Sequence, residues 1–354
     1  MYDIIIVGAG PAGSNLARLL GEQYKVLIID KRDLENESVV NSRSKCCGGL
    51  LAPDAQEMLA KLELGLPKEI LVSPQLFAVR TIDITNSLER LYQRFYININ
   101  REKFDKWLVS MIPDSVDRRF GSLFKRLEFK DEYCEITFIQ NGVCHIEKAK
   151  LIVGADGANS SVRKYIDNKN SLNQYVSIQE WFECKKPQPY FTAIFDEKIT
   201  DFYSWVIPKD GNILVGSALN INESPKEKFN FLKDKLSNYG FELEKSLKKE
   251  GAYINRPTKS NHFFTGTNRI ALIGEASGSI SPSSAEGISY ALKSSLFLHE
   301  SLVNGIEGFH KSYNRKSNSL KFNLLFKNLK IPAMYQPKIR NLVMKSGLLS
   351  IDDN

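Results

Sequence analysis

The chain has few of the residues that form disulfide frameworks and metal centres. Its 354 residues include only five cysteines and four histidines. The cysteines show no framework spacing, which favours a reduced, cytoplasmic protein. Cys46 and Cys47 are adjacent, without a CxxC pair or a histidine cluster. We therefore expect no metal site.

Long hydrophobic runs are also missing. No stretch of about 18 apolar residues is present that would span a bilayer. The apolar residues near the start run directly into GAGPAG, whereas a signal peptide has an uninterrupted hydrophobic region. We expect neither a transmembrane segment nor a signal peptide.

Acidic residues are absent from a long C-terminal segment. The formal net charge is +7, and Lys311 to Lys345 contains nine Lys/Arg and no Asp/Glu, interleaved with apolar residues. One interpretation is a helical tail that packs by its apolar face and leaves its basic face solvated. The alternative is attachment to an anionic membrane surface, peripherally at the inner face of the membrane. We expect no nucleic-acid partner.

The first thirty residues have the pattern of a βαβ unit. Residues 3–7 (DIIIV) and 25–29 (KVLII) are continuous apolar runs, as expected of buried parallel strands. Between them, Leu16, Leu19 and Leu20 lie on one helical face, and Gly21 marks the helix end. Asp30 closes the second strand.

The turn after the first strand contains Gly8, Gly10 and Gly13 in the pattern GxGxxG. Gly8 permits the tight turn, Gly10 lets the backbone approach a pyrophosphate, and Gly13 lets the helix pack on the strand. The helix N-terminus favours the negative charge of the phosphates. Asp30, 22 residues after Gly8, is placed to bind an adenosine ribose. The unit therefore predicts dinucleotide binding without choosing between NAD and FAD.

The rest of the chain predicts an α/β protein with a second sheet inserted into a discontinuous nucleotide domain. Residues 31–45 are polar and indicate a loop. We expect a hairpin in 76–99, a helix in 101–111, strands in 115–153, an antiparallel sheet in 175–218, and a return to the first domain at 269–274 with a helix from about 286. The predicted domains are 1–75, 99–170 and 265–310 for nucleotide binding, 76–98 and 171–264 for the substrate, and 311–354 as a basic helical segment.

Two later segments favour FAD. Residues 151–163 (LIVGADGANSSVR) resemble the DG fingerprint of the p-hydroxybenzoate hydroxylase-type flavoproteins, and residues 270–292 (IALIGEASGSISPSSAEGISYAL) resemble their GD fingerprint. The resemblance implies that fold, with a Rossmann-like FAD-binding domain and an inserted antiparallel substrate domain. It places Asp156 in the DG turn and Glu275 where the family has an aspartate for the flavin ribityl chain. Asp156 also suits turn formation before Gly157.

The second of these segments ends at a predicted helix start. Backbone N–H groups of Gly287 and Ile288 there would stabilise the negative charge of a reduced flavin. Gly287 would also let the ring approach without a Cβ in the way.

A narrower resemblance is to the geranylgeranyl reductase branch of these flavoproteins. It rests on KCCGGL (45–50), REKFD (101–105) and YSWVIP (203–208), which resemble that branch's Cys-Gly element, RxxFD helix and YxWxFP strand. The departures are Ile207 for Phe, Thr200 for a leading Pro, and the doubled cysteine. Stretches such as GGLLAPDAQ and YININR also resemble a bacterial FAD-dependent oxidoreductase of this branch over nearly the whole chain. This resemblance implies FAD contacts at Ala12, Asp30, Cys47, Gly48, Arg101, Leu123, Glu275, Gly287 and Ile288.

The resemblance implies an FAD-dependent enzyme that reduces C=C bonds of an isoprenoid or other lipid-like apolar substrate. The catalytic candidates are Cys47, Tyr203 and Trp205. Tyr203 and Trp205 share one strand face and would form an apolar wall, with Phe182, Phe191 and Phe195 as further lining residues. No second GxGxxG follows, so the electron donor would be transiently bound NAD(P)H or a redox protein.

Two alternatives remain open at this point. YSWVIP differs by one residue from the WxWxIP element of flavin halogenases, so a monooxygenase or halogenase is the rival enzyme. The non-enzymatic alternative is an FAD-bound module that senses redox state or docks on a membrane.

Overall fold

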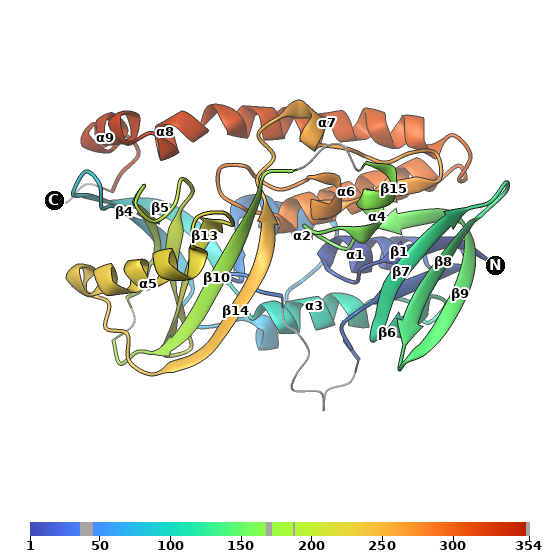
Figure 1. The fold of residues 1–354 in the computed structure, drawn as a ribbon, viewed down its shortest axis with the longest axis horizontal. Coiled ribbons are helices and arrows are strands. Elements are labelled where there is room, and N and C mark those ends of the chain that lie inside the picture. The colour runs from blue at the N-terminus through green and yellow to red at the C-terminus, as the bar shows by residue number, and fades with distance from the viewer. Residues whose placement is uncertain (36–44, 168–171, 187, 352–354) are drawn as a thin grey trace. The chain divides into compact units, whose positions relative to one another are not determined.

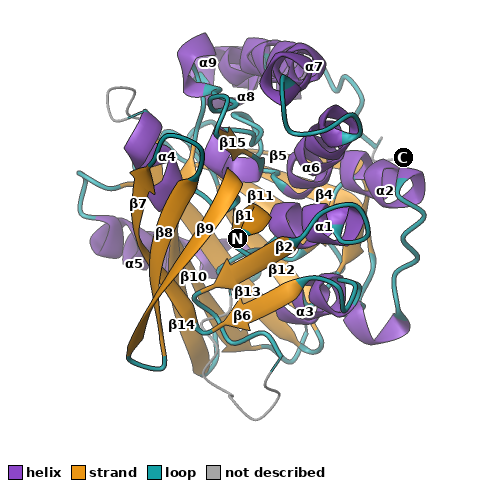
Figure 2. Cartoon of the chain, turned by 90° about the vertical axis from the view of Figure 1, so that its right-hand side faces the viewer, coloured by secondary structure: helices purple, strands orange, loops and turns teal. Residues whose placement is uncertain are grey.

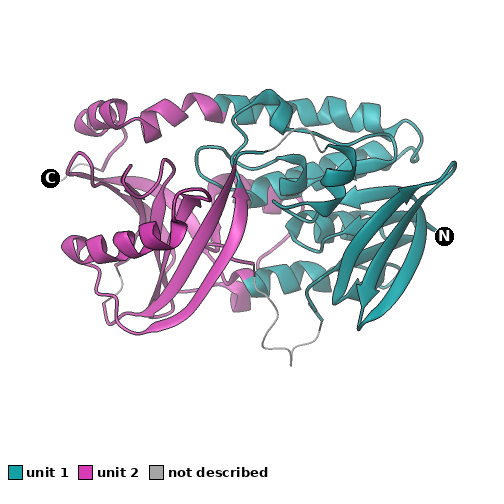
Figure 3. Ribbon diagram, in the orientation of Figure 1, with its two compact units in different colours: residues 1–44, 102–173, 255–326 teal, residues 45–101, 174–254, 327–354 magenta. Residues whose placement is uncertain are grey.

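The computed structural model describes residues 1–35, 45–167, 172–186 and 188–351. Its contacts divide the chain into two compact units (Figure 3). The first comprises 1–44, 102–173 and 255–326, and the second 45–101, 174–254 and 327–354. Residues 36–44 of the loop expected at 31–45 lie outside the described residues.

The two largest differences between this division and the predicted domains are at residues 45–75 and in the C-terminal segment, and residues 99–101 and 255–264 also change units. Residues 45–75 belong to the second unit, where β3 (Leu50–Leu51) pairs with β5 (Leu88–Asn98). The C-terminal segment divides between the units at residue 327. Neither of these two differences is visible in the sequence, because both depend on contacts between segments that are far apart along the chain.

The sheet of the first unit is parallel at its centre. β6 (Asp117–Phe120), β2 (Val26–Asp30), β1 (Tyr2–Val7), β9 (Val143–Gly154) and β15 (Ile270–Leu272) follow one another in that order. The second half of β9 pairs in parallel with β1 and β15. Its first half pairs antiparallel with β8 (Cys134–Gln140), which continues to β7 (Ser122–Phe129). β9 therefore joins the parallel sheet to a three-stranded meander.

Both faces of β1 are buried, as its continuous apolar run predicts. Ile4 and Ile6 pack with the helices α1 (Pro11–Leu20), α6 (Ile288–Leu302) and the start of α7 (Phe309–Leu329). Ile5 and Val7 pack against the meander and α4 (Ser161–Ile166). Figure 2 shows α6 beside α1 on one side of the parallel strands.

The second unit contains an eight-stranded sheet with the order β14-β10-β13-β12-β11-β4-β5-β3. It is mainly antiparallel, with β4 (Leu76–Asp83) and β11 (Phe191–Phe195) paired in parallel. The other strands are β10 (Gln174–Glu183), β12 (Ser204–Lys209), β13 (Asn212–Asn220) and β14 (Ser246–Asn255).

One face of this second sheet is covered by α5 (Pro225–Leu236), which buries Phe229, Leu232 and Leu236 against it. The unit also contains α2 (Pro53–Lys61), α8 (Ile331–Tyr335) and α9 (Pro337–Lys345) (Figure 1). The predicted fold class is confirmed, with an α/β unit, an inserted sheet and a helical C-terminal segment. Over the described part of the chain, every helix is too short or too polar to span a bilayer.

Candidate functional site

The three motif segments of the first unit meet at the carboxyl ends of its parallel strands. Gly8 N donates to Ile29 O at 2.8 Å, Ala155 N donates to Val7 O at 2.8 Å, and Ile273 N donates to Gly154 O at 3.0 Å. These bonds connect the turns that follow β1, β9 and β15. In open α/β sheets, ligands bind outside this edge.

The glycines of the first turn divide into two packed positions and one open position. Gly8 has a φ of +109°, and a Cβ there would lie 2.5 Å from Ala155 O. A Cβ on Gly13 would lie 1.8 Å from Gly8 O, so α1 can approach β1 only with glycine at that position. A Cβ on Gly10 would have no atom within 4 Å. Gly10, the N-cap of α1, therefore faces open space at a helix N-terminus, which suits a phosphate group.

Asp30 is nearly buried at the end of β2, and it organises the same turn. Its Oδ2 accepts a hydrogen bond from Ala9 N at 2.7 Å, and Arg32 donates to both carboxylate oxygens. Arg32 also reaches Asp105 Oδ2 at 2.7 Å and Ala9 O at 3.2 Å. Burial would lower the pKa of Arg32, but Asp30 and Asp105 outweigh it and raise this pKa above its ordinary value. Arg32 is therefore a fixed cation between two buried carboxylates.

The turn after β15 packs directly on the start of α1. Gly274 has a φ of +58°, and a Cβ there would lie 3.0 Å from the Cβ of Ala12. Its N–H donates to Ser294 Oγ of α6 at 2.8 Å. The next residue, Glu275, accepts a hydrogen bond from Asn255 N at 2.9 Å. Gly274 is thus packed on Ala12, and Glu275 directly follows it.

Helix α6 starts where the sequence predicts a helix N-terminus. Gly287 is its N-cap and Ile288 its first residue. A Cβ on Gly287 would meet only Ile280, at 3.6 Å, an ordinary contact distance. Glu286 Oε1 accepts from Ser289 N at 3.2 Å and so caps the first turn.

Asp156 has the turn-forming role that the sequence suggests. Its carboxylate accepts from Ser160 Oγ at 2.5 Å and from Ser161 N at 2.6 Å, at the start of α4. Burial raises its pKa above the ordinary value, against the lowering effect of these hydrogen bonds. Leu123 of β7 is 45% exposed.

In the second unit, Cys46 and Cys47 differ in environment. Cys46 is buried, its Sγ lies 3.7 Å from Ser177 Oγ, and burial raises its pKa to about 12. Cys47 is also desolvated, which by itself would raise its pKa, but the Arg101 guanidinium, a hydrogen bond from Gly49 N and the charge of Lys45 lower it below the ordinary value. Of the two thiols, Cys47 is therefore the more readily deprotonated.

Lys209 forms a buried polar centre beside the Cys47 turn. Its Nζ donates to Asn98 Oδ1 at 2.5 Å, to Ile99 O at 2.9 Å and to Gly49 O at 3.1 Å. An ammonium has three donors, and all three have acceptors here. Burial lowers its pKa to about 7, while the negative charge of Cys47 acts in the opposite direction. Lys209 thus holds the Gly49 turn against the end of β5.

Tyr203 and Trp205 lie on the sheet face opposite α5, the same face as Lys209. Their rings are 5.4 Å apart, and a Cβ on Gly48 would contact Ile207 of this face at 2.7 Å. Burial, together with Tyr96 and Cys47, raises the pKa of Tyr203 well above its ordinary value, so the hydroxyl stays protonated. The structure therefore brings the three catalytic candidates, Cys47, Tyr203 and Trp205, to one face.

Of the other expected lining residues, Phe191 and Phe195 pack with Tyr203, whereas the expectation for Phe182 is wrong. Phe182 lies in the core beneath α5 with Phe229 and Leu232. The reason is register. Phe182 pairs with Ile213, and Trp181 pairs with Leu214, so the side chain of Phe182 points to the face that α5 covers.

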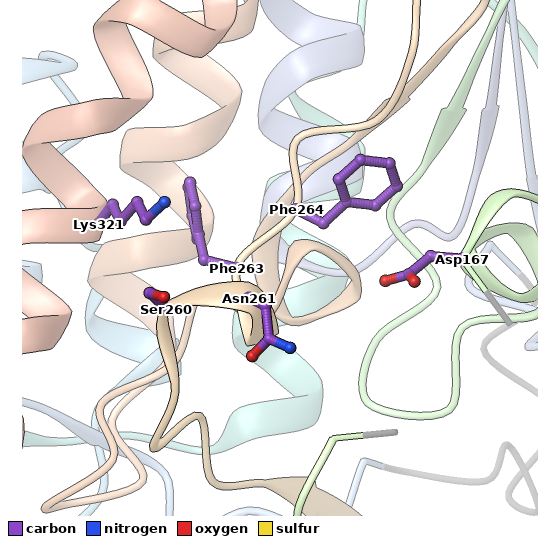
Figure 4. Close-up of a pocket in the computed structure, with 6 residues that line it drawn as sticks. All are labelled: Asp167, Ser260, Asn261, Phe263, Phe264 and Lys321. Atoms are coloured by element: carbon purple, nitrogen blue, oxygen red, sulfur yellow. The ribbon is translucent and has the colours of Figure 1, made fainter. Parts of the chain in front are cut away.

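A pocket of about 430 Å³ in the first unit is separate from these residues. It is lined by Asp167, Ser260, Asn261, Phe263, Phe264 and Lys321. Figure 4 shows the Lys321 side chain beside the ring of Phe263. None of the motif residues lines this pocket.

Sequence reasoning missed Arg32 and Lys209. Arg32 lies two residues after Asp30, where an arginine can fold back on the acid, and this spacing was a usable signal. Lys209 directly follows YSWVIP and precedes Asp210-Gly211, so it resembles a solvated turn residue. Its acceptors come from residues 49, 98 and 99, and no local pattern reveals them.

Comparison with known proteins gives full-length relatives. Protein CbrA of Escherichia coli K12 is 40% identical over 350 residues, which cover 99% of this chain and 98% of that protein. Protein CbrA of Shigella sonnei gives the same identity and coverage. No family profile matches the chain.

Solved structures share the fold at low identity. A geranylgeranyl bacteriochlorophyll reductase-like protein of Thermoplasma acidophilum has a TM-score of 0.72 at 20% identity, covering 99% of this chain and 88% of that one. PqsL of Pseudomonas aeruginosa, a probable FAD-dependent monooxygenase, has a TM-score of 0.69 at 12% identity, with 98% and 99% covered. The flavin-dependent brominase Bmp2 has a TM-score of 0.69 at 17% identity, with 98% and 93% covered.

These neighbours confirm the predicted flavoprotein fold. The full-length similarity to Protein CbrA is more specific than the fold, because its sequence identity of 40% is at least twice that of these structures. The chain belongs to the CbrA family.

Proposed function

We propose that the protein is an FAD-dependent oxidoreductase. The observation that carries this proposal is the open position at Gly10, at the N-terminus of α1 and next to Asp30. The other glycines of this turn, Gly8 and Gly13, are closely packed. Gly10, where an added side chain would fill the open space, is the glycine whose backbone approaches a pyrophosphate in this motif. The flavoprotein fold of the structural neighbours supports FAD over NAD.

Each predicted contact has a role in this proposal. The turn of Gly8, Gly10, Ala12 and Gly13 holds the pyrophosphate, and Asp30 binds the adenosine ribose. Asp30 already accepts four hydrogen bonds, from Ala9 N, Arg32 N and two nitrogens of the Arg32 guanidinium. These fill the about four acceptor directions of its two oxygens, so a ribose hydroxyl would replace one of them. Glu275 binds the ribityl chain, and the N–H groups of Gly287 and Ile288 bind the pyrimidine edge of the flavin. For Cys47, Gly48, Arg101 and Leu123, the support is the family resemblance.

We further propose that the reaction is reduction of a C=C bond in an isoprenoid or other lipid-like substrate. FAD supplies the hydride when reduced, and a proton from solvent completes the addition. Support comes from the aromatic face of the second sheet, where Tyr203, Trp205, Phe191 and Phe195 offer apolar contacts. The likeness in fold to a geranylgeranyl reductase-like protein is consistent with this class of substrate. The electron donor is NAD(P)H or a redox protein.

The test is a product analysis. The purified protein is reduced anaerobically and incubated with geranylgeranyl lipids, and mass spectrometry measures the products. We expect products heavier by one pair of hydrogens per reduced bond. Trp205→Leu should slow the reaction about tenfold by loss of apolar contact, whereas Trp107→Leu in α3 (Arg101–Ser110), a residue of the first unit, should not. A reduced protein that leaves every isoprenoid unchanged would contradict the substrate class and leave FAD binding intact.

The monooxygenase or halogenase alternative is tested by the reaction of the reduced protein with oxygen. Oxygenating enzymes protect an oxygen-reactive state from water, and a reductase does not need to. Stopped-flow mixing with oxygen should show return to the oxidised spectrum in one phase. A long-lived second species would favour the oxygenating alternative.

A further inference from the structure

Helix α7 presents a second apolar stripe on its outward side. Phe322, Leu325, Phe326 and Leu329, called here the α7 stripe, are 62%, 38%, 68% and 73% exposed. Their spacing of three and four residues puts them on one side of the helix. The opposite side is already packed, because Tyr313, Leu320 and Leu324 are buried. The stripe is therefore additional to the face by which the helix packs.

The charges on this helix are of one sign. Lys311 and Arg315 lie eleven and seven residues before Phe322, respectively, on the same outward side by helical periodicity, and both are exposed. Lys330, also exposed, follows the last residue of the stripe. The outward side thus combines large apolar side chains with cations.

Three other cations of the segment 311–345 have acidic partners. Lys316 pairs with Glu300 at 2.6 Å, Lys327 pairs with Asp54 at 2.9 Å, and Arg340 pairs with Asp83 at 2.7 Å. Lys321 lines the pocket of the first unit instead of the outward side (Figure 4). On α7 and directly after it, the cations that we assign to the docking surface are therefore Lys311, Arg315 and Lys330.

We propose that the outward side of α7 docks on the surface of an anionic phospholipid bilayer. The α7 stripe enters the interface between headgroups and acyl chains, and the flanking cations contact the phosphates, as in interfacial amphipathic helices. Charge favours this occupant over a second copy of the chain, since the segment 311–345 has no acidic residue and two copies would oppose like charges.

Helix α9 in the second unit has a similar pattern. Ile339, Leu342 and Val343 are 37%, 71% and 37% exposed, and Lys338 and Lys345 are exposed beside them. Its other side buries Arg340 and Met344. The surface does not depend on flavin chemistry, and FAD retention reports separately on the proposed function.

The experiment is co-sedimentation of the full chain with vesicles. One set contains phosphatidylcholine and phosphatidylglycerol in equal amounts, and the other contains phosphatidylcholine alone. We expect the protein to bind the anionic vesicles at low salt, to be released as salt screens the attraction, and to ignore the neutral vesicles. No binding to anionic vesicles at low salt, or equal binding to both sets, overturns the proposal.

Two variants with matched controls locate the surface. Phe322→Ser with Phe326→Ser should weaken binding about tenfold for each side chain, whereas Phe77→Ser, at 63% exposed on β4, should not. Lys311→Gln with Arg315→Gln should weaken it about fivefold per cation, whereas Lys125→Gln with Arg126→Gln on β7 should not. Equal losses in variants and controls overturn the assignment to α7. A dimer that the phenylalanine variant dissociates, without vesicle binding, would make a second copy the occupant and also overturn it.

Discussion

The two compact units differ in how their functional residues are assembled. In the first unit, most residues that face the proposed cofactor lie within a few positions of the ends of β1, β2, β9 and β15, and Gly287 and Ile288 lie at the start of α6. In the second unit, the Lys209 side chain donates to Gly49 O and Asn98 Oδ1, and the Arg101 guanidinium lowers the pKa of Cys47 against the effect of burial. The first site depends on backbone turns, and the second on side-chain charge and hydrogen bonds. Mutations should therefore act on steric fit in one unit and on electrostatics in the other.

The largest effect is expected at Gly13. A Cβ at this position would lie 1.8 Å from Gly8 O, and backbone atoms on both sides prevent relaxation. Gly13→Ala should lower the free energy of unfolding by about 4 kcal/mol, measured by denaturant titration. Gly65→Ala in the second unit, where a Cβ meets no atom within 4 Å, is the control. Equal stability of the two variants would show that the first turn is not closely packed.

The next effect is expected at Lys209. Lys209→Met leaves Asn98 Oδ1, Ile99 O and Gly49 O without their donor, at a cost of about 3 kcal/mol. Lys245→Met, at an exposed position, should cost little. A Lys209 variant as stable as the wild type would mean that the cluster is not a structural centre of the second unit.

The lowered pKa of Lys209 also predicts that the free energy of unfolding depends on pH. Burial lowers its pKa to about 7 from the ordinary value of 10.5. Between these values the unfolded chain holds a proton that the folded protein has lost, so the free energy of unfolding should rise with pH. Below about 7 both states are protonated, and this contribution is constant. Lys209→Met should lose the rise, and denaturant titrations at several pH values measure it.

The two units also differ in how well the sequence predicts their site residues. The strand-turn-helix pattern around Gly8 to Asp30 is local, so chain order alone predicts its geometry. Cys47 was identified by resemblance, but only the position of Arg101 distinguishes it from Cys46. Lys209 could not be found, because its three acceptors lie at the paired strands β3 and β5, whereas Lys209 ends β12, which β11 and β4 separate from β5 in the sheet. The expectation that Phe182 lines the substrate pocket was wrong, because the strand register decides on which face of the sheet its side chain lies, and the sequence does not specify this register.

A smaller effect separates the two adjacent cysteines. Iodoacetamide at neutral pH should label Cys47 of the FAD-free protein more than about a hundredfold faster than Cys46, since only Cys47 has a lowered pKa. Arg101→Gln should slow labelling of Cys47, and Lys103→Gln on the same helix should not. Mass spectrometry of each peptide measures the rates. Equal labelling of both thiols would contradict the different environments.

The smallest effect compares two glutamates of the first unit. Glu275→Ala should weaken FAD binding about tenfold by loss of one charge-assisted hydrogen bond. Glu286→Ala should weaken it less, because Glu286 caps α6 through Ser289 N. Titration of both FAD-free variants with FAD measures the dissociation constants. Equal losses would remove the ribityl role from Glu275.

The central claim is that the open position at Gly10 holds the pyrophosphate of FAD. Gly10→Val adds a branched side chain where a Cβ meets no protein atom within 4 Å, so the variant should fold with wild-type stability. The measurement is the ratio of FAD to protein, from the visible absorbance of the purified wild type and variant. The account predicts a yellow wild type and a stable, colourless Gly10→Val. A folded Gly10→Val that retains full FAD, or a wild type that takes up none, would contradict it.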